Sequence, residues 1–286
     1  MSSSARLDRA ALDVHPLPPV IDGDKETKGR ILILAGSRDV PGAALLAATA
    51  AMRAGAGELR IATTTSTAPQ LGMAMPEAMV IGLPEADDGG FAAIATALIA
   101  ELASAVDAVV AGPGVKANAA CPKITSTLLN CGAALALDVA FLEALREADH
   151  SRPQLPILLP NTDELVNLLD CDEGQVKADP IRCGHTAAER YKSLILVKGV
   201  VSHVVTPGGQ AWSYEGGAPG LGVSGSGDVL AGIVGGLLAR GADPLAALLW
   251  AVWLHGEAGA KLAKKIGPIG FLAREIAGQV PALLPR

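Results

Sequence analysis

The sequence predicts an α/β fold with a mostly parallel central sheet, helices on both faces and antiparallel strands at one edge. From residue 30 onward, short runs that are apolar throughout alternate with helical stretches, a pattern typical of parallel strands buried on both faces. The pattern changes after residue 194, where three strand-like runs lie close together and Pro207-Gly208-Gly209 supplies a hairpin turn. These two observations place antiparallel strands beside a parallel sheet.

The elements follow in order along the chain. Helices are expected at residues 43–54, 92–103, 228–240 and 244–264, with Gly55 and Gly241 typical of helix C-termini. Strands are expected at residues 30–34, 58–63, 78–83, 108–111, 134–138, 156–159, 194–198, 202–206 and 211–214. Because no linker or internal repeat interrupts this series, residues 30–286 are expected to form a single domain. Residues 1–29 are expected to form an N-terminal arm, extended rather than packed, because they contain a proline-rich run and then a mostly charged one.

Composition limits the classes of function. Half of the 286 residues are hydrophobic and 18% are charged, so the chain can bury a large core. The net charge of -6 and the pI near 5.4 argue against nucleic acid or an anionic membrane as a partner. Four cysteines without a CxxC pair, the lack of an apolar signal core and the lack of a membrane-length apolar stretch predict a cytoplasmic protein with reduced thiols. We expect a homo-oligomer, which the apolar surplus allows.

The strongest local signal is Gly225-Ser226-Gly227-Asp228, which runs directly into an apolar helix. Glycines let several backbone N–H groups point at one place, and the first turn of a helix leaves such donors unpaired, so the segment predicts an anion or phosphate site. Asp228 is placed to accept a proton from a substrate hydroxyl. The alternative is that Asp228 only caps the helix, and this segment alone leaves both possibilities open.

Other candidate motifs follow predicted strands, where ligands bind in open parallel sheets. Gly112-Pro113-Gly114 is one, although most such turns only reverse the chain, and the small residues before Ala43 occupy the equivalent place after the first strand. Asn161 and Glu164 have the spacing of a helix capping box, with a magnesium or phosphate role for Glu164 as the alternative.

Two basic side chains complete the candidates. Lys198, followed by Gly199, either places an ammonium group near phosphates or is a solvated lysine, and the second alternative is slightly favoured. His255 lies in an apolar helix and is expected to be a hydrogen-bonded packing residue rather than a catalyst.

Taken in order, these motifs resemble the ADP/ATP-dependent NAD(P)H-hydrate dehydratases of the ribokinase-like superfamily. The resemblance covers nearly the whole chain and includes Ala35-Gly36-Ser37, Pro41-Gly42-Ala43-Ala44-Leu45, Arg53-Ala54-Gly55-Ala56-Gly57, Gly112-Pro113-Gly114, Lys198-Gly199, Gly225-Ser226-Gly227-Asp228 and Leu254-His255-Gly256. The segment at residues 41–45 points to the dehydratase branch, whereas the turn at residues 225–228 is shared across the superfamily. The resemblance implies a ribokinase-like fold and repair of hydrated NADH or NADPH.

The resemblance also implies a role for each matching residue. Asp228 would be the base, and Gly225, Ser226 and Gly227 would bind the phosphoryl group that ADP or ATP transfers to the substrate hydroxyl. Ala43, Gly114, Asn161 and Asp228 would contact the hydrated cofactor. The adenine nucleotide would be held by Lys198, Gly199, Val200, Val201, Ser202 and Gly227, with Mg²⁺ as the counter-ion of its phosphates and Glu164 as the candidate metal ligand.

Two positions depart from the family pattern. Asn161 stands where the family has a substrate-contacting histidine, and Ala140 replaces the second acid of an Asp-Ala-Asp stretch that here reads Asp138-Val139-Ala140. An asparagine still donates and accepts hydrogen bonds but does not carry a proton. Two alternatives therefore stay open beside the dehydratase: an ATP-dependent small-molecule kinase of the same superfamily, and a catalytically silent nucleotide-binding protein.

Overall fold

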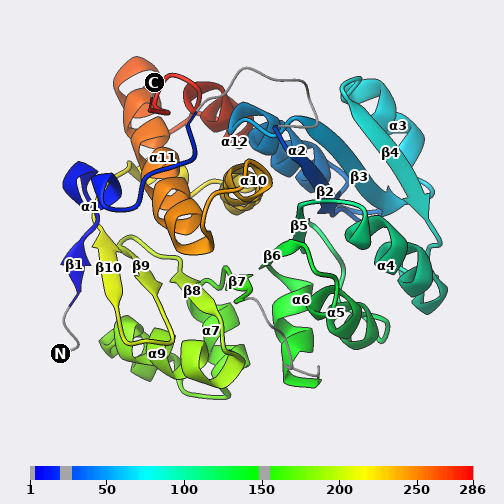
Figure 1. Ribbon diagram of the computed structural model, residues 1–286, viewed down its shortest axis with the longest axis horizontal. Coiled ribbons are helices and arrows are strands. Elements are labelled where there is room, and N and C mark those ends of the chain that lie inside the picture. The colour runs from blue at the N-terminus through cyan, green and yellow to red at the C-terminus, as the bar shows by residue number, and fades with distance from the viewer. Residues whose placement is uncertain (1–3, 20–27, 148–154, 286) are drawn as a thin grey trace.

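The computed structural model describes residues 4–19, 28–147 and 155–285. The strands within these residues form one sheet of ten strands (Figure 1). The strand order is β1-β10-β9-β8-β7-β6-β5-β2-β3-β4. All neighbouring strands from β8 to β4 are parallel, whereas β9 runs antiparallel to both β8 and β10. The strands are β1 (Ala5–Arg6), β2 (Arg30–Leu34), β3 (Glu58–Thr64), β4 (Ala78–Leu83), β5 (Ala108–Ala111), β6 (Ala134–Leu137), β7 (Ile157–Leu158), β8 (Leu194–Val197), β9 (Ser202–Val205) and β10 (Ala211–Tyr214).

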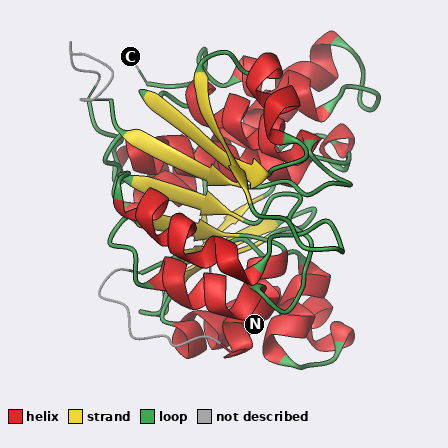
Figure 2. Cartoon of the chain, turned by 90° about the vertical axis from the view of Figure 1, so that its right-hand side faces the viewer, coloured by secondary structure: helices red, strands yellow, loops and turns green. Residues whose placement is uncertain are grey.

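Helices cover both faces of the sheet (Figures 1 and 2), with α2, α10 and α11 on one side and α5, α7 and α9 on the other. This arrangement confirms the predicted α/β architecture. The helices are α1 (Arg9–Asp13), α2 (Gly42–Arg53), α3 (Ala68–Ala74), α4 (Thr96–Ser104), α5 (Cys121–Leu129), α6 (Ala140–Glu143), α7 (Thr162–Leu169), α8 (Glu173–Ala178), α9 (Pro180–Tyr191), α10 (Ser226–Ala239), α11 (Pro244–Lys265) and α12 (Ala273–Ile276). Short 3₁₀ helices are η1 (Ala93–Ala95), η2 (Ala144–Glu147), η3 (Pro219–Leu221) and η4 (Ala277–Gln279).

The apolar strands divide their side chains between two cores. In β2, Ile31 and Ile33 pack in the core on one face, and Leu32 and Leu34 pack in the core on the other face. All four side chains are fully buried. Successive side chains of a strand point to opposite faces, so a strand covered on both sides must be apolar at every position.

A close helix crossing fixes α10 against α2. Ideal Cβ atoms on Gly232 and Gly236 would lie 2.2 Å and 2.3 Å from the carbonyl oxygens of Ala47 and Ala51. Only glycine allows the two backbones to approach so closely, which accounts for the glycines within an otherwise apolar helix. The crossing positions the N-terminal turn of α10 relative to α2.

The described part of residues 1–29 packs on the domain. It contains β1, which pairs with β10, and α1, from which Leu12 is fully buried. The carbonyl oxygen of His15 accepts a hydrogen bond from Trp250 Nε1 at 2.8 Å. The expectation of an extended, unpacked segment is therefore wrong for these residues, and the mostly charged run at residues 22–26 lies outside the described residues. The division into an arm and one domain stays a prediction.

The remaining differences concern element boundaries and short elements. The helix predicted at residues 92–103 begins as η1 and becomes α-helical only at Thr96. The strand predicted at residues 134–138 ends at Leu137, because Asp138 already belongs to a turn closed by a hydrogen bond from the Phe141 N–H to the Asp138 carbonyl at 3.3 Å. No sequence pattern predicted β1, α1, α3, α5, α6, α8, α9 or α12.

Candidate active site

The motifs singled out in the sequence meet at one edge of the sheet. The five strands β2, β5, β6, β7 and β8 are consecutive parallel neighbours, so their carboxyl ends lie side by side. The residues that follow them are Ala43 after β2, Gly114 after β5, Asp138 after β6, Asn161 and Glu164 after β7, and Lys198 after β8. Ligands bind at this edge in open α/β sheets.

The turn at residues 225–228 forms the first turn of α10. Gly225 is the N-cap, with a left-handed φ of 87° that favours glycine. The Ser226 N–H donates to the Val223 carbonyl at 3.1 Å, while the described chain supplies no main-chain acceptor for the N–H groups of Gly227 and Asp228. Asp228 lies three residues after the N-cap and makes no capping hydrogen bond, so the capping alternative is wrong. Two oriented donors at a helix N-terminus suit an anion.

Asp228 is held in a partly desolvated position beside other charges. Burial is the main cause that raises the pKa of its carboxyl to about 6, and repulsion from Asp138 adds to the rise, whereas Lys198 opposes it. A carboxylate with a pKa nearer to neutrality is a stronger base than an ordinary aspartate and is still mostly ionised at neutral pH. Asp228 therefore has the protonation chemistry of a general base.

Lys198 is half-buried in an acidic cluster. Its side chain is 18% exposed, and its Nζ lies 2.8 Å from Asp138 Oδ1 and 3.7 Å from Glu164 Oε2. Burial lowers the pKa of Lys198, but attraction to Asp138, Glu164 and Asp228 outweighs it and raises the pKa, so the ammonium stays charged. The solvated lysine favoured from the sequence is thus wrong, because β8 ends against β7 and turns the side chain into the site.

Asn161 and Glu164 form the capping box that their spacing predicts. The Glu164 N–H donates to Asn161 Oδ1, and the Asn161 N–H donates to Glu164 Oε2, both at 2.8 Å. Burial raises the pKa of Glu164, against the attraction of Lys198. No group of three or more histidine, cysteine, aspartate or glutamate side chains in the described residues has the geometry to hold a metal ion. The role of Glu164 as a ligand of Mg²⁺ stays a prediction.

Ala43 and Gly114 are in direct contact. An ideal Cβ on Gly114 would lie 2.5 Å from Ala43 Cβ and 2.8 Å from the Val40 carbonyl oxygen, and the φ of Gly114 is 64°. A side chain at position 114 would therefore push the loop after β5 away from the start of α2. The structure brings together these two predicted substrate contacts, which come from different strands.

The turn between β8 and β9 lies next to Lys198. Gly199 and Val200 are exposed, Val200 almost completely, and Ser202 Oγ lies 3.5 Å from the Gly199 carbonyl oxygen. Val201 and Ser202 are half-buried. This segment is open to a ligand from the solvent side, and its predicted role in nucleotide binding stays a prediction.

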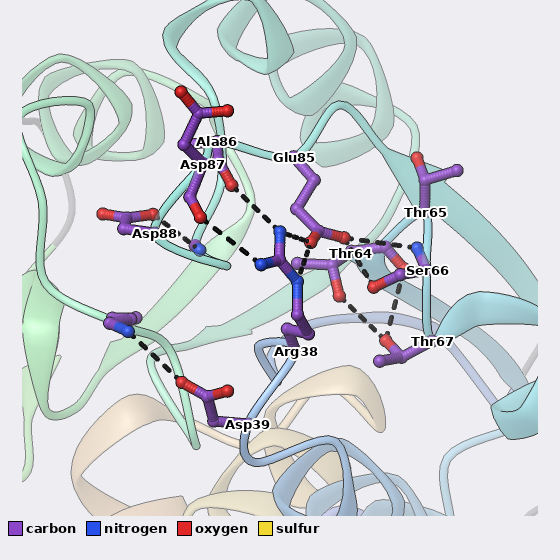
Figure 3. A network of polar contacts seen from close by, with 12 residues as sticks. Arg38, Asp39, Thr64, Thr65, Ser66, Thr67, Glu85, Ala86, Asp87 and Asp88 are labelled. Carbon is purple, nitrogen blue, oxygen red and sulfur yellow. Dashed lines mark hydrogen bonds and ion pairs between the residues drawn. The ribbon is translucent and has the colours of Figure 1, made fainter.

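Arg38 connects three loops near the start of α2 (Figure 3). Its Nε lies 2.5 Å from Glu85 Oε1, and its guanidinium also donates to the carbonyl oxygens of Asp87 and Ala86. Ser66, which follows β3, donates its hydroxyl to Glu85 Oε2 at 2.6 Å. This hydrogen bond and the ion pair with Arg38 hold the pKa of Glu85 below its usual value, although desolvation opposes them. The network fixes the loop that leads from β2 to Ala43.

A second ion pair holds the same loop from the other side. Lys116, in the loop after β5, lies with Nζ 3.2 Å from Asp39 Oδ2. No sequence motif points to Arg38, Glu85 or Lys116, because Glu85 is 47 residues from Arg38 and Asp39 is 77 residues from Lys116 along the chain.

His255 is a packing residue, as predicted, and it contacts the N-terminal turn of α10. Its Nε2 lies 3.0 Å from Ser226 Oγ and 3.1 Å from the Ser226 carbonyl oxygen. Burial lowers the pKa of His255 to about 4, so the ring is neutral at neutral pH. The histidine therefore supports Ser226 without bringing a charge to the site.

Two general expectations can be checked outside the site. The four cysteines are all unpaired, as predicted. None of the helices in the described residues has the length and apolar character to cross a membrane.

A family model and a curated relative of this chain name the same activity. A model of the family described as NAD(P)H-hydrate dehydratase matches residues 31–282. The ADP-dependent (S)-NAD(P)H-hydrate dehydratase of Xanthomonas campestris pv. campestris is 45% identical over 278 residues, which cover 97% of this chain and 95% of that protein.

Solved structures agree with the fold. The ADP/ATP-dependent NAD(P)H-hydrate dehydratase of Bacillus subtilis, co-crystallised with ATP and Mg²⁺, is similar with a TM-score of 0.85 and 26% identity, covering 98% of this chain and 97% of that chain. A ribokinase-like superfamily protein of Enterococcus faecalis has a TM-score of 0.83 at 24% identity, covering 98% of this chain and 95% of that chain, and supports the fold alone.

Proposed function

Because this chain belongs to the NAD(P)H-hydrate dehydratase family, we propose that it dehydrates hydrated NADH or NADPH at the expense of ADP or ATP and so regenerates the reduced cofactor. The observation that carries the proposal is the position of Asp228. Its carboxyl group has a pKa raised to about 6 and lies in the same helical turn as two unpaired N–H groups. The positive charge of Lys198 attracts this carboxylate. A carboxylate, two N–H donors and an ammonium group thus occur together, which supports the proposal.

In the first step, Asp228 accepts the proton of the substrate hydroxyl while the hydroxyl oxygen bonds to the terminal phosphorus of the nucleotide. The bond from that phosphorus to the bridging oxygen breaks, and ADP leaves as AMP. The N–H groups of Gly227 and Asp228 stabilise the charge on the transferred phosphoryl group, as oriented backbone donors do. Gly225 and Ser226 shape this turn, and Lys198 offsets the charge on the phosphates.

In the second step, the phosphorylated hydrate loses inorganic phosphate and a proton from the adjacent ring carbon. The carbon–carbon double bond of the dihydronicotinamide forms again, without any change in oxidation state. Phosphate is a far better leaving group than hydroxide, which explains why a dehydration needs a nucleotide. Ala43, Gly114 and Asn161 would hold the nicotinamide ring in place.

The nucleotide would occupy the side of the site formed by Lys198, Gly199, Val200, Val201 and Ser202. Magnesium, when bound, neutralises the phosphate charge and is usually held more by phosphates and water than by protein. This agrees with a site that offers Glu164 as a single ligand. A homo-oligomeric state and a cytoplasmic location stay predictions.

The absorbance of reduced nicotinamide tests the proposal. Purified protein, Mg²⁺ and hydrated NADH are mixed with ADP or with ATP, and a nucleotide-dependent rise is expected. A flat trace with both nucleotides, from folded protein, would favour the small-molecule kinase, which would keep Asp228 as base but leave a stable phosphorylated product. Binding of ADP without any turnover of alcohols would favour the silent nucleotide-binding protein.

A further inference from the structure

Three carboxylates surround one ammonium group in the candidate active site. Lys198 Nζ pairs with Asp138 and Glu164, whereas no ion pair between Lys198 and Asp228 occurs in the described structure. Lys198 nevertheless lies beside the turn that carries Asp228, since an ideal Cβ on Gly227 would be 3.7 Å from its Nζ. Lysine has a flexible four-carbon stem. The observed pairing is therefore one of at least two that the side chain could adopt.

The backbone holds Asp138 firmly. Val139 has φ 49° and ψ -118°, a conformation typical of glycine at the first central position of a type II′ turn, and a strained one for a β-branched residue. On the other side, an ideal Cβ on Gly112 would lie 2.0 Å from the Asp138 carbonyl oxygen. Asp138 itself is 1% exposed. Strain of this kind persists where the surroundings fix the backbone, and it is frequent in functional sites.

We propose that Asp138 is a positioning residue that keeps Lys198 from forming an ion pair with Asp228, so that the Asp228 carboxylate stays available to accept the substrate proton. The inference rests on the proposed function, because it takes Asp228 as the base. It assigns a role to a carboxylate that is buried and paired with Lys198.

The chemical reason is competition for one ammonium. A lysine within about 4–6 Å of a carboxylate stabilises its ionised form and lowers its pKa by roughly one to three units, which weakens it as a base. A direct ion pair would also occupy the oxygen that must face the hydroxyl. With Asp138 in place, the ammonium stays near enough to meet phosphate but is bound to another carboxylate.

The charged and titratable groups around Asp228 come from four elements. Asp138 follows β6, Lys198 follows β8, Glu164 lies in α7, and His255 lies in α11. His255 is neutral near neutral pH because burial lowers its pKa. Lys198 and Asp138 are the charged groups that act on Asp228 in opposite directions.

Carboxyl-carbon NMR titration of Asp228 tests the inference without substrate, in the wild type and in Asp138→Asn and Lys198→Met. In Asp138→Asn, the pKa of Asp228 should fall by at least about one unit, because repulsion from Asp138 is lost and the released ammonium approaches Asp228, and kcat should fall at least about tenfold. The fall in pKa should be smaller when Lys198→Met is also present, because only the lost repulsion then remains. In Lys198→Met, the loss of the ammonium should raise the pKa of Asp228. Asp107→Asn is the matched control, because Asp107 pairs with Arg30 away from the site and its loss should leave Asp228 unchanged.

Unchanged titration of Asp228 in both variants, or shifts in the same direction, would overturn the inference. If Asp138→Asn does not fold, Lys198→Met still tests the inference. An unchanged or lowered pKa of Asp228 in Lys198→Met would show that Asp138 and Asp228 do not compete for the Lys198 ammonium. Failure of the proposed function is a separate result: wild-type protein would not regenerate NADH, whatever the titrations give.

Discussion

Replacing Asp228 with asparagine should lower activity and raise stability at the same time. The carboxyl has a pKa of about 6 in the folded protein, against an ordinary value of 3.8. At about 1.4 kcal/mol per pKa unit, this difference corresponds to roughly 3 kcal/mol by which the ionised carboxylate destabilises the fold. Asparagine has nearly the same shape and carries no charge, so it removes this penalty. Loss of a general base costs roughly 10²–10⁴-fold in turnover.

The sign of the pH dependence follows from proton binding. Between about pH 4 and pH 6, the folded protein binds more protons at Asp228 than the unfolded chain does, so the contribution of this group to stability falls as pH rises through that window. Above about pH 6, the wild type has the full penalty. Asp228→Asn should therefore be up to roughly 3 kcal/mol more stable than the wild type at about pH 7.5, and nearly equal to it at about pH 4.

The assay pairs urea unfolding at both pH values with the rate of NADH formation and with ADP binding by calorimetry. The affinity for ADP should stay within about threefold of the wild type, because the backbone N–H groups of the anion site are unchanged. Turnover within about tenfold of the wild type would remove Asp228 from the role of base. A variant that is equally destabilised at both pH values would show that burial of the carboxylate is not costly.

Four further predictions address separate parts of the site. In the wild type, kcat/KM should fall about tenfold per pH unit below about pH 6, because the base must be ionised; a profile that is flat to about pH 4.5 would contradict it. Val139→Gly should raise the free energy of unfolding by about 1 kcal/mol, because the strain relieved at φ 49° exceeds the extra backbone entropy that glycine loses on folding. A lower free energy of unfolding in urea would show that Val139 is not strained. Asn161→Ala should lower stability by about 1 kcal/mol through loss of the N-cap, and no change would mean that the capping box adds nothing. Arg38→Ala should raise the KM for the hydrate and leave the KM for ADP unchanged, because the hydrogen bonds of Arg38 fix the loop before Ala43 (Figure 3). The matched control is Lys177→Ala, which removes an exposed ion pair with Glu173 far along the chain. Equal effects of the two substitutions on the KM for the hydrate would show that the Arg38 network does not position this loop.

Much of the fold was predictable because its signals are local. In β2 every residue after Arg30 is apolar, β5 is apolar at every position, and α10 and α11 contain long apolar runs, so pattern alone locates them. The capping box of Asn161 and Glu164 is also a local motif, and the structure confirms it. By contrast, β1 has two exposed residues without an apolar pattern, and only its pairing with β10 makes it a strand.

The site was predictable in its parts and less so in its interactions. Gly114, Lys198 and Asp228 each follow a recognisable turn or strand, so their gathering at one edge follows from the parallel topology. The pairing of Lys198 with Asp138 was not predictable, because Asp138 is 60 residues away in the sequence. The strained φ of Val139 could not be foreseen either, since a valine at that position contradicts local propensity.

Phosphorus NMR of a complete reaction tests the central claim most directly. Wild-type protein, Mg²⁺, ADP and hydrated NADH should give AMP, inorganic phosphate and NADH in equal amounts, because the phosphoryl group is transferred to the hydrate and then eliminated. A stable phosphorylated product without release of phosphate, or release of phosphate without NADH, would contradict the proposed dehydration.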